Sequence, residues 1–199
     1  MVAVQTYMDA AYMRLLIAED EWLVATTLRY ELESLGHEVV GIATNGTDAV
    51  QMCRRERPDL VLMDIQMPQM SGVEATRTLM EQSPVCVVVV TGRAQLESAC
   101  QQAGAMAHVM KPLLAHQIPE LLSEALRRFE RFKRVAAAGG DPAAGLRAWV
   151  TVIRAIHRVS DVEGLSEEQA FERLLDRARE QGQPPEQVAR EILGDPGEC

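Results

Sequence analysis

Two short stretches of the chain, residues 60–63 and 85–90, are apolar at every position. A strand with one face in water alternates apolar and polar residues, so a continuously apolar strand is expected inside a sheet covered on both faces. Further strand candidates are residues 15–18, 39–43 and 106–110, and helix-length segments lie between the candidates. Because parallel neighbours need crossover connections, this alternation predicts an α/β fold with a doubly wound, five-stranded parallel sheet.

The pattern changes after residue 134. Residues 135–145, VAAAGGDPAAG, are small and rich in glycine, which is typical of a linker. Only helical segments follow, near residues 146–160, 167–181 and 185–193, and Ser166 with Gln169 forms a capping box before the second. We therefore expect a small all-α, three-helix domain behind the α/β domain. The expected division is an N-terminal extension (1–13), a first domain (14–134), a linker (135–145), a second domain (146–194) and a tail (195–199).

Composition excludes several classes of protein. The formal charge of −9 argues against a chain that coats nucleic acid non-specifically, because such binding depends on neutralising phosphates. The longest strongly apolar run is far shorter than the roughly 20 residues of a membrane span, and the first residues lack the basic start of a secretory signal. The cysteines form no Cys-x-x-Cys pair, which favours reduced thiols in the cytoplasm.

Polar side chains follow the predicted strands where each one ends. Glu19 and Asp20 follow the first strand, Asp64 the third, Thr91 the fourth and Lys111 the fifth. Ligands of open parallel sheets gather at this edge, so these side chains are expected to share a pocket. Clustered carboxylates suit Mg²⁺, and a carboxylate nucleophile beside a metal, a hydroxyl and an ammonium suits phosphoryl transfer.

These motifs resemble the receiver domain of bacterial two-component response regulators, over about residues 13–130. The matching segments are Glu-Asp-Glu after RLLIA, LVLMDIQMP around the third-strand aspartate, Thr-Gly after the valine run, and Lys-Pro. The resemblance implies a flavodoxin-like fold in which Asp64 accepts a phosphoryl group from a sensor histidine kinase. It also implies Mg²⁺ held by Glu19, Asp20, Asp64 and the backbone carbonyl of Gln66. Thr91 and Lys111 would contact the phosphoryl group and report its arrival. Such a protein is a signal-transducing phosphoacceptor that supports only its own phosphorylation and dephosphorylation, and is not an enzyme acting on other substrates.

Two departures from the receiver pattern bear on signalling. His108 stands three residues before Lys111, where receivers usually carry Tyr or Phe, so the switch would use an imidazole that titrates near neutral pH. An ordinary surface role for His108 is the alternative. Gln69 and Ser71 occupy positions where Gly and Asp are common, which is expected to change loop shape more than chemistry.

The predicted helix over residues 146–160 carries Arg147, Arg154 and Arg158 on one narrow stripe, opposite an apolar face. Such a row of guanidinium groups can meet phosphates, although a solvated face is the ordinary alternative. A basic cluster at residues 127–134, with a net charge of +4, lies nearby in sequence and strengthens the first interpretation.

Residues 164–193 resemble the ANTAR domain, the three-helix RNA-binding output module of antitermination regulators. The resemblance rests on Gly-Leu-Ser at 164–166, Ala170-Phe171, and Val188-Ala189 followed by Ile192. It implies binding to a structured leader RNA and transcription antitermination, and it allows a phosphorylation-dependent homodimer. The Ala-Lys-Gly stretch of the family is reduced to its alanine, Ala155. A protein partner is therefore the alternative to RNA, whereas the acidic last helix is a poor surface for DNA. No membrane partner is expected.

Overall fold

The structure, a computed structural model, describes residues 12–92, 94–137 and 141–194. Most of the expected N-terminal extension, Gly139 and Gly140 of the expected linker, and the tail over 195–199 lie outside these residues. The chain divides into two compact units, Met1–Glu130 and Arg131–Cys199, and each is described by itself. The division falls within one helix, a little before residue 134, and the functional domain boundaries stay a prediction.

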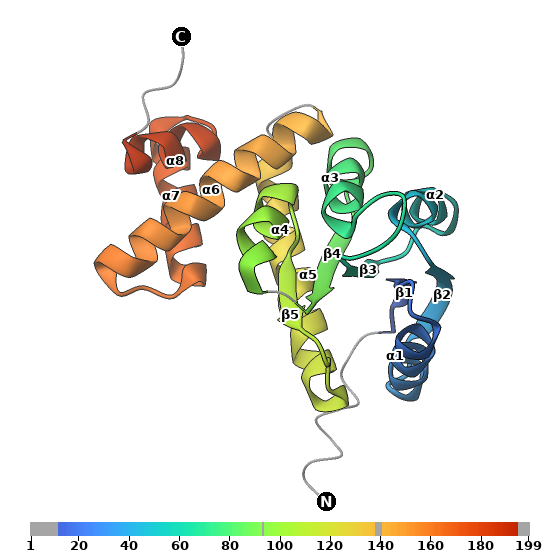
Figure 1. Cartoon of the computed structure of the whole chain (residues 1–199). Coiled ribbons are helices and arrows are strands. Elements are labelled where there is room, and N and C mark those ends of the chain that lie inside the picture. The colour runs from blue at the N-terminus through green and yellow to red at the C-terminus, as the bar shows by residue number, and fades with distance from the viewer. Residues whose placement is uncertain (1–11, 93, 138–140, 195–199) are drawn as a thin grey trace, which may run out of the picture. The chain divides into compact units, whose positions relative to one another are not determined.

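The first unit contains the expected five-stranded parallel sheet, with strand order β2-β1-β3-β4-β5 (Figure 1). The strands are β1 (Arg14–Ala18), β2 (Glu38–Ala43), β3 (Leu60–Asp64), β4 (Cys86–Thr91) and β5 (Ala107–Met110). Every residue of β3 and β4 is buried, as their continuous apolar sequences predict. The predicted fold class and strand positions are therefore confirmed.

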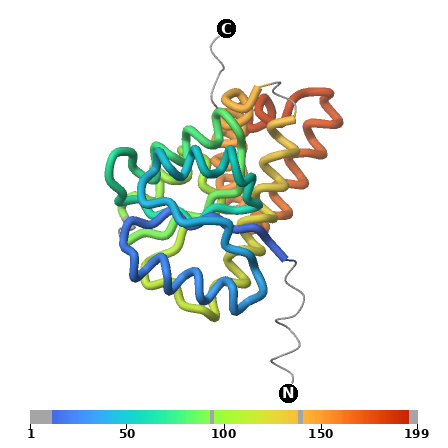
Figure 2. Tube along the Cα trace, turned by 90° about the vertical axis from the view of Figure 1, so that its right-hand side faces the viewer, coloured from blue at the N-terminus to red at the C-terminus, as the bar shows by residue number. Residues whose placement is uncertain are grey.

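Helices cover both faces of this sheet; Figure 2 shows α1 on one side and α2 and α3 on the other. Their bounds are α1 (Trp22–Ser34), α2 (Gly46–Glu56), α3 (Gly72–Gln82), α4 (Glu97–Ala103) and α5 (Ile118–Ala136), with short 3₁₀ turns at Ala94–Leu96 and Ala115–Gln117. Alternate strand residues point to opposite faces. Leu16, Val61 and Val87 thus join the core cluster that includes Ala49 of α2 and Leu79 of α3.

Local sequence signals end and begin these helices. Gly36, which follows α1, has φ of +89°, the left-handed conformation expected of a glycine after a helix. Ser71 caps α3 and forms a capping box with Glu74. Gln69, also in the loop before α3, has φ of +66°, a conformation that favours glycine. The expectation that these two departures, Gln69 and Ser71, change loop shape more than chemistry stays a prediction.

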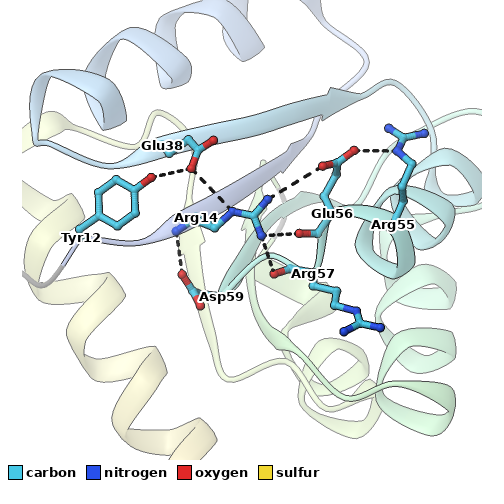
Figure 3. A network of polar contacts seen from close by, with 7 residues as sticks. All are labelled: Tyr12, Arg14, Glu38, Arg55, Glu56, Arg57 and Asp59. Carbon is cyan, nitrogen blue, oxygen red and sulfur yellow. Dashed lines mark hydrogen bonds and ion pairs between the residues drawn. The ribbon is translucent and has the colours of Figure 1, made fainter.

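A network of polar contacts holds the start of β1 at the amino edge of the sheet (Figure 3). The Arg14 guanidinium lies 3.6 Å from a carboxylate oxygen of Glu38 and donates a hydrogen bond to the carbonyl of Glu56. The Arg14 amide donates to Asp59 at 2.7 Å, and the Tyr12 hydroxyl donates to Glu38 at 2.5 Å. These contacts tie β1 to β2 and to the end of α2.

The second unit contains α6 (Pro142–Glu163), α7 (Glu167–Gln181) and α8 (Pro185–Leu193), together with the last turns of α5. Helix α6 begins earlier and ends later than the sequence predicted. The Asp141 side chain accepts hydrogen bonds from the amides of Ala143 and Ala144, and Pro142 suits the first helical position. At the other end, Gly164 adopts a left-handed conformation that ends the helix. The predicted capping box of Ser166 and Gln169 is confirmed.

Aromatic and aliphatic side chains fill the core of the second unit. Phe132, from the end of α5, meets Trp149 of α6 edge-on, with ring centroids 6.0 Å apart. Phe171 of α7 and Val188 of α8 are fully buried. This packing explains why the last turns of α5 belong with the helical unit. None of the helices within the described residues is long and apolar enough to cross a membrane.

Candidate phosphoacceptor site and arginine face

The topology of the sheet brings the predicted acidic residues together. In the sheet, β2 lies on one side of β1 and β3 lies on the other, so the chain changes direction across the sheet at β1. Ligands of open parallel sheets bind at the carboxyl ends of the strands beside such a point. Glu19 and Asp20 follow β1, and Asp64 ends β3, directly beside it. Glu19 is held there because its amide donates a hydrogen bond of 2.9 Å to the carbonyl of Ala43 at the end of β2.

A cluster of carboxylates and one ammonium forms the site. One oxygen from each of Glu19, Asp20 and Asp64 lies within 4.8 Å of the others. The Lys111 ammonium lies 2.7 Å from Glu19 Oε2 and 3.1 Å from Asp64 Oδ2, so it bridges the two buried acids. Glu19 and Asp64 are 2% and 6% exposed, whereas Asp20 is open to solvent. The cluster therefore consists of two buried carboxylates and a third that faces solvent at Asp20.

The surroundings raise the pKa values of both Glu19 and Lys111, but for different reasons. Burial raises the pKa of Glu19, and the neighbouring charge of Asp64 adds to this, while Lys111 opposes it. Burial alone would lower the pKa of Lys111, but its hydrogen bonds to Glu19 and Asp64 raise it above its ordinary value. Lys111 is thus a permanent cation in this pocket, and the carboxylates still repel one another. A further cation would relieve that repulsion.

The donor set of the pocket fits Mg²⁺. Mg²⁺ prefers carboxylate and carbonyl oxygens and keeps several waters, which an exposed ligand such as Asp20 permits. Glu19, Asp20 and Asp64 supply oxygens close enough to share one ion. The carbonyl of Gln66, the second residue after β3, stays a predicted further ligand.

The loop between β3 and α3 fixes the main chain at Asp64. The Ile65 amide donates a hydrogen bond of 2.8 Å to Asp64 Oδ1, which orients the carboxylate. The Gly72 amide donates to the carbonyl of Ile65 at 2.9 Å. A Cβ at Gly72 would lie only 1.9 Å from the carbonyl oxygen of Asp64, so glycine is required for this close approach.

The predicted switch residues lie on the neighbouring strands. Thr91, the last residue of β4, is 2% exposed, and its carbonyl accepts a 2.8 Å hydrogen bond from the Lys111 amide. His108 of β5 is partly exposed, and its Nε2 lies 3.3 Å from a carboxylate oxygen of Glu97, the first residue of α4. The imidazole therefore has a specific acidic neighbour that the sequence did not reveal.

The second unit presents the predicted row of arginines on α6. Arg147, Arg154 and Arg158 are all exposed. Among the described residues, these guanidinium groups take part in no recorded ion pair, whereas Arg173, Arg177 and Arg190 of α7 and α8 each pair with a carboxylate. The α6 row is therefore available to anions from outside the chain.

Part of the basic cluster at residues 127–134 has a different role. The Arg134 guanidinium makes two hydrogen bonds to the Glu172 carboxylate, at 2.6 and 3.1 Å, and lies 5.2 Å from the centre of the Phe171 ring. Arg131 lies 3.7 Å from Glu168 and 5.7 Å from the same ring. These side chains stabilise the second unit, so they add less to a phosphate-binding surface than the sequence suggested.

Comparison with protein families agrees with both halves of this description. Residues 15–123 match the response regulator receiver domain, and residues 144–193 match the ANTAR domain. The chain belongs to the response regulator family. Its second unit therefore contains an ANTAR output domain, as the sequence resemblance implied.

Named relatives show how far the similarity extends. The transcriptional regulatory protein PdtaR of Mycobacterium tuberculosis is 33% identical over 191 residues, which cover 93% of this chain and 92% of that protein. A protein-glutamate methylesterase of Mesorhizobium japonicum is 47% identical, but over only 43% of this chain and 25% of that enzyme. The response regulator domain of Thermotoga maritima CheB superimposes with a TM-score of 0.53 at 27% identity, covering 60% of this chain and 97% of that one. Similarity to the esterases is thus confined to a receiver-sized segment.

Sequence reasoning missed two hollows in the surface. One, of about 490 Å³, lies beside Lys111 in the receiver domain, and the other, of about 280 Å³, lies in the ANTAR domain. Each is lined by residues from separate segments of the chain. For the hollow beside Lys111, the sequence signal was the apolar start of α1, which includes the lining residues Leu23 and Val24.

Proposed function

We propose that this response regulator accepts a phosphoryl group on Asp64 from a sensor histidine kinase and then controls transcription by binding RNA. The observation that carries the proposal is the convergence of Glu19, Asp20, Asp64 and Lys111 at the carboxyl edge of the sheet. Its action is proposed to be in the cytoplasm, where the buried free thiols of Cys53, Cys86 and Cys100 stay reduced.

In the proposed transfer, a carboxylate oxygen of Asp64 attacks the phosphorus of a phosphohistidine. The new P–O bond forms as the P–N bond breaks, and the bonding electron pair leaves with the imidazole nitrogen. Lys111 faces the oxygens that carry negative charge, and the Thr91 hydroxyl would donate a hydrogen bond to one of them. Glu19, Asp20, Asp64 and the Gln66 carbonyl would hold Mg²⁺, which neutralises charge on the phosphoryl oxygens when bound.

Incubation with acetyl phosphate and Mg²⁺ tests this step. We expect one labelled phosphoryl group per wild-type chain and none on Asp64→Asn. Asp161→Asn changes an exposed acid in the ANTAR domain and is the matched control, with wild-type labelling. Undiminished labelling of Asp64→Asn refutes the assignment.

The hollow beside Lys111 is proposed to receive the histidine-bearing helix of the kinase. Leu23, Val24 and Leu113 line it with mostly apolar surface, and Lys111 also lines it. A helix that packs on this surface with its apolar side would bring a phosphohistidine next to the pocket of Asp64.

A pair of variants on α1 separates docking from chemistry. Leu23→Asp is expected to slow transfer from a phosphorylated histidine kinase at least tenfold, because burying the new carboxylate is costly. Labelling by acetyl phosphate, which needs no docking surface, is expected to stay unchanged. Tyr30→Asp is the matched control, since Tyr30 is 71% exposed on the same helix but does not line the hollow. Equal effects of both variants on kinase transfer would contradict this docking site.

Phosphorylation is proposed to reach the output domain through Thr91, Lys111 and His108. The Lys111 ammonium leaves at least one of its carboxylate partners when it contacts a phosphoryl group. On β5, the strand that Lys111 follows, the pair of His108 and Glu97 couples the strand to α4, so a shift of β5 would strain or release this pair. A phosphorylation-dependent homodimer remains part of the proposal, and light scattering with and without acetyl phosphate measures it.

The proposed ligand of the output domain is a structured leader RNA, bound on the arginine face of α6. The ANTAR match, a relative named as a transcriptional regulator, and three exposed arginines without a recorded ion pair among the described residues support this. Binding of this kind predicts affinity that falls steeply with salt, because the arginines displace counterions from phosphates.

Crosslinking in cells, followed by sequencing of the RNA recovered with the phosphorylated protein, tests RNA binding. We expect enriched hairpins in the wild type and their loss in Arg154→Glu combined with Arg158→Glu. Arg179→Glu is the matched control, since Arg179 lies on α7 and pairs with Asp176. If the α6 double variant recovers the same RNA, the arginine face is refuted as its binding surface. If no RNA is enriched, a protein partner takes its place.

A further inference from the structure

The ANTAR domain contains a groove between α6, α7 and α8, of about 280 Å³. Its apolar surface comes from Val162 of α6, Leu174 of α7 and Ile192 of α8, among others. Val162 is 76% exposed, so part of this apolar surface faces solvent. The groove therefore offers an apolar slot that opens to solvent at the C-terminal part of α6.

Three arginines, Arg158, Arg173 and Arg177, also line this groove. Arg173 pairs with Glu163, which also lines the groove, and Arg177 Nη2 lies 3.2 Å from Glu191 of α8. These pairs restrain two of the guanidinium groups that line the groove. Arg158, the last member of the α6 row, also lines the groove and has no recorded ion pair among the described residues. The lining thus contains two cations that are already paired and one, Arg158, that is available for a new anion.

We propose that this groove holds one unstacked base of the bound RNA, with an adjacent phosphate on Arg158. The proposal rests on the RNA binding proposed above and names the part of the RNA that the domain recognises. Proteins that recognise RNA sequence take splayed bases from single-stranded loops and stack them on aromatic rings or arginine planes. The groove, of about 280 Å³, has room for a single base but is far too small for a duplex.

Charge complementarity favours a nucleotide over an acidic protein segment as the occupant. Arg147 and Arg154 continue from Arg158 along one side of α6, over a length of about 16 Å at 1.5 Å per residue. An RNA strand can bring successive phosphates to this row while one base turns into the apolar slot. An acidic peptide would satisfy the arginines but would bring its charge to the apolar surface of Val162 and Leu174, which is costly.

A double-mutant cycle between protein and RNA tests the assignment. The probe is the hairpin most enriched by crosslinking, made with an abasic site at each loop position in turn, and the full-length phosphorylated protein is used. We expect one abasic position to weaken wild-type binding about tenfold or more. In Val162→Asn, which changes an exposed side chain and preserves the fold, the same abasic site is expected to cost much less. The logarithm of the binding constant falls with the logarithm of the salt concentration, and the steepness of this fall is the salt slope. Arg158→Gln is expected to lower the salt slope by about one, whereas Val162→Asn leaves it unchanged.

Arg179→Gln is the matched control, because Arg179 lies on the same helix as Arg173 and Arg177 but outside the groove. It is expected to preserve the wild-type cost of every abasic site. The binding free energy lost through an abasic site and that lost through Val162→Asn can also simply add at every loop position. In that case the groove does not hold a base, and an acidic protein segment becomes its candidate occupant. Recovery of no enriched RNA refutes the proposed function and this assignment together, whereas additivity with tight RNA binding refutes the assignment alone.

Discussion

Gly72 gives the sharpest test of how Asp64 is positioned. It is the first residue of α3, and its missing side chain allows the helix to approach the end of β3. A Cβ at this position would lie 1.9 Å from the carbonyl oxygen and 2.8 Å from the carbonyl carbon of Asp64. We predict that Gly72→Ala destabilises the receiver domain and displaces the main chain at Asp64.

The size of the effect follows from the contact distance. An ordinary contact begins at 3.4 Å, so α3 and the end of β3 must separate by about 1.5 Å. Overpacking costs about 1–3 kcal/mol when side chains can adjust, and a buried main chain adjusts poorly, so we take the upper value. The better helix propensity of alanine recovers up to ~1 kcal/mol. The expected loss in unfolding free energy is therefore about 2 kcal/mol.

Hydrogen exchange measured by mass spectrometry reads each domain separately. Peptides from β3 are expected to exchange about 30-fold faster in Gly72→Ala, the ratio that 2 kcal/mol implies, while peptides from α7 keep the wild-type rate. Mg²⁺ affinity should fall as well, because Asp64 moves. Gly92→Ala is the control for stability, since a Cβ there has no neighbour within 4 Å among the described residues. Wild-type exchange of β3 in Gly72→Ala would refute the reasoning.

Three further predictions concern buried side chains. Burial lowers the pKa of His37, so below pH ~6.5 the unfolded chain binds more protons than the folded chain, and stability falls as the pH drops through that range. Urea unfolding at pH 7.5 and pH 5 should show that His37→Leu loses less unfolding free energy between these two pH values than the wild type. An equal loss in both proteins contradicts this prediction. Burial raises the pKa of Cys53 to about 12, so the native thiol should resist iodoacetamide at about pH 8, where rapid alkylation would be inconsistent with its burial. Phe132→Ala should lower the stability of the ANTAR domain by about 3–5 kcal/mol, seen as faster exchange in α7; unchanged exchange would mean that the end of α5 is not part of that core.

The receiver fold could be predicted from sequence because each strand and each helix end has a local cause. Residues 60–63 and 85–90 are apolar throughout because both faces of β3 and β4 are covered. The acidic residues could be assigned to one site because parallel strands present their carboxyl ends on one edge. The bounds of α6 were less predictable, since the cap at Asp141 follows a linker-like segment without periodicity.

Other features depend on side chains that are distant in sequence. Sequence grouped Arg131 and Arg134 with a phosphate-binding surface, yet Glu168, Glu172 and the Phe171 ring engage them. The acidic neighbour of His108 and the groove beside Arg158 are likewise made by separate elements. No sequence pattern predicts such contacts.

By itself the sequence determined the α/β class, the strand that each functional residue of the first domain follows, and the families that the two domains resemble. These follow from periodicity and from residue types at strand ends, which act locally. The tertiary structure alone decided that Lys111 bridges Glu19 and Asp64, and that three arginines of α6 stay available while those of α7 and α8 are paired. Charge pairing and close approach depend on distances between elements, and only the packed chain sets those distances.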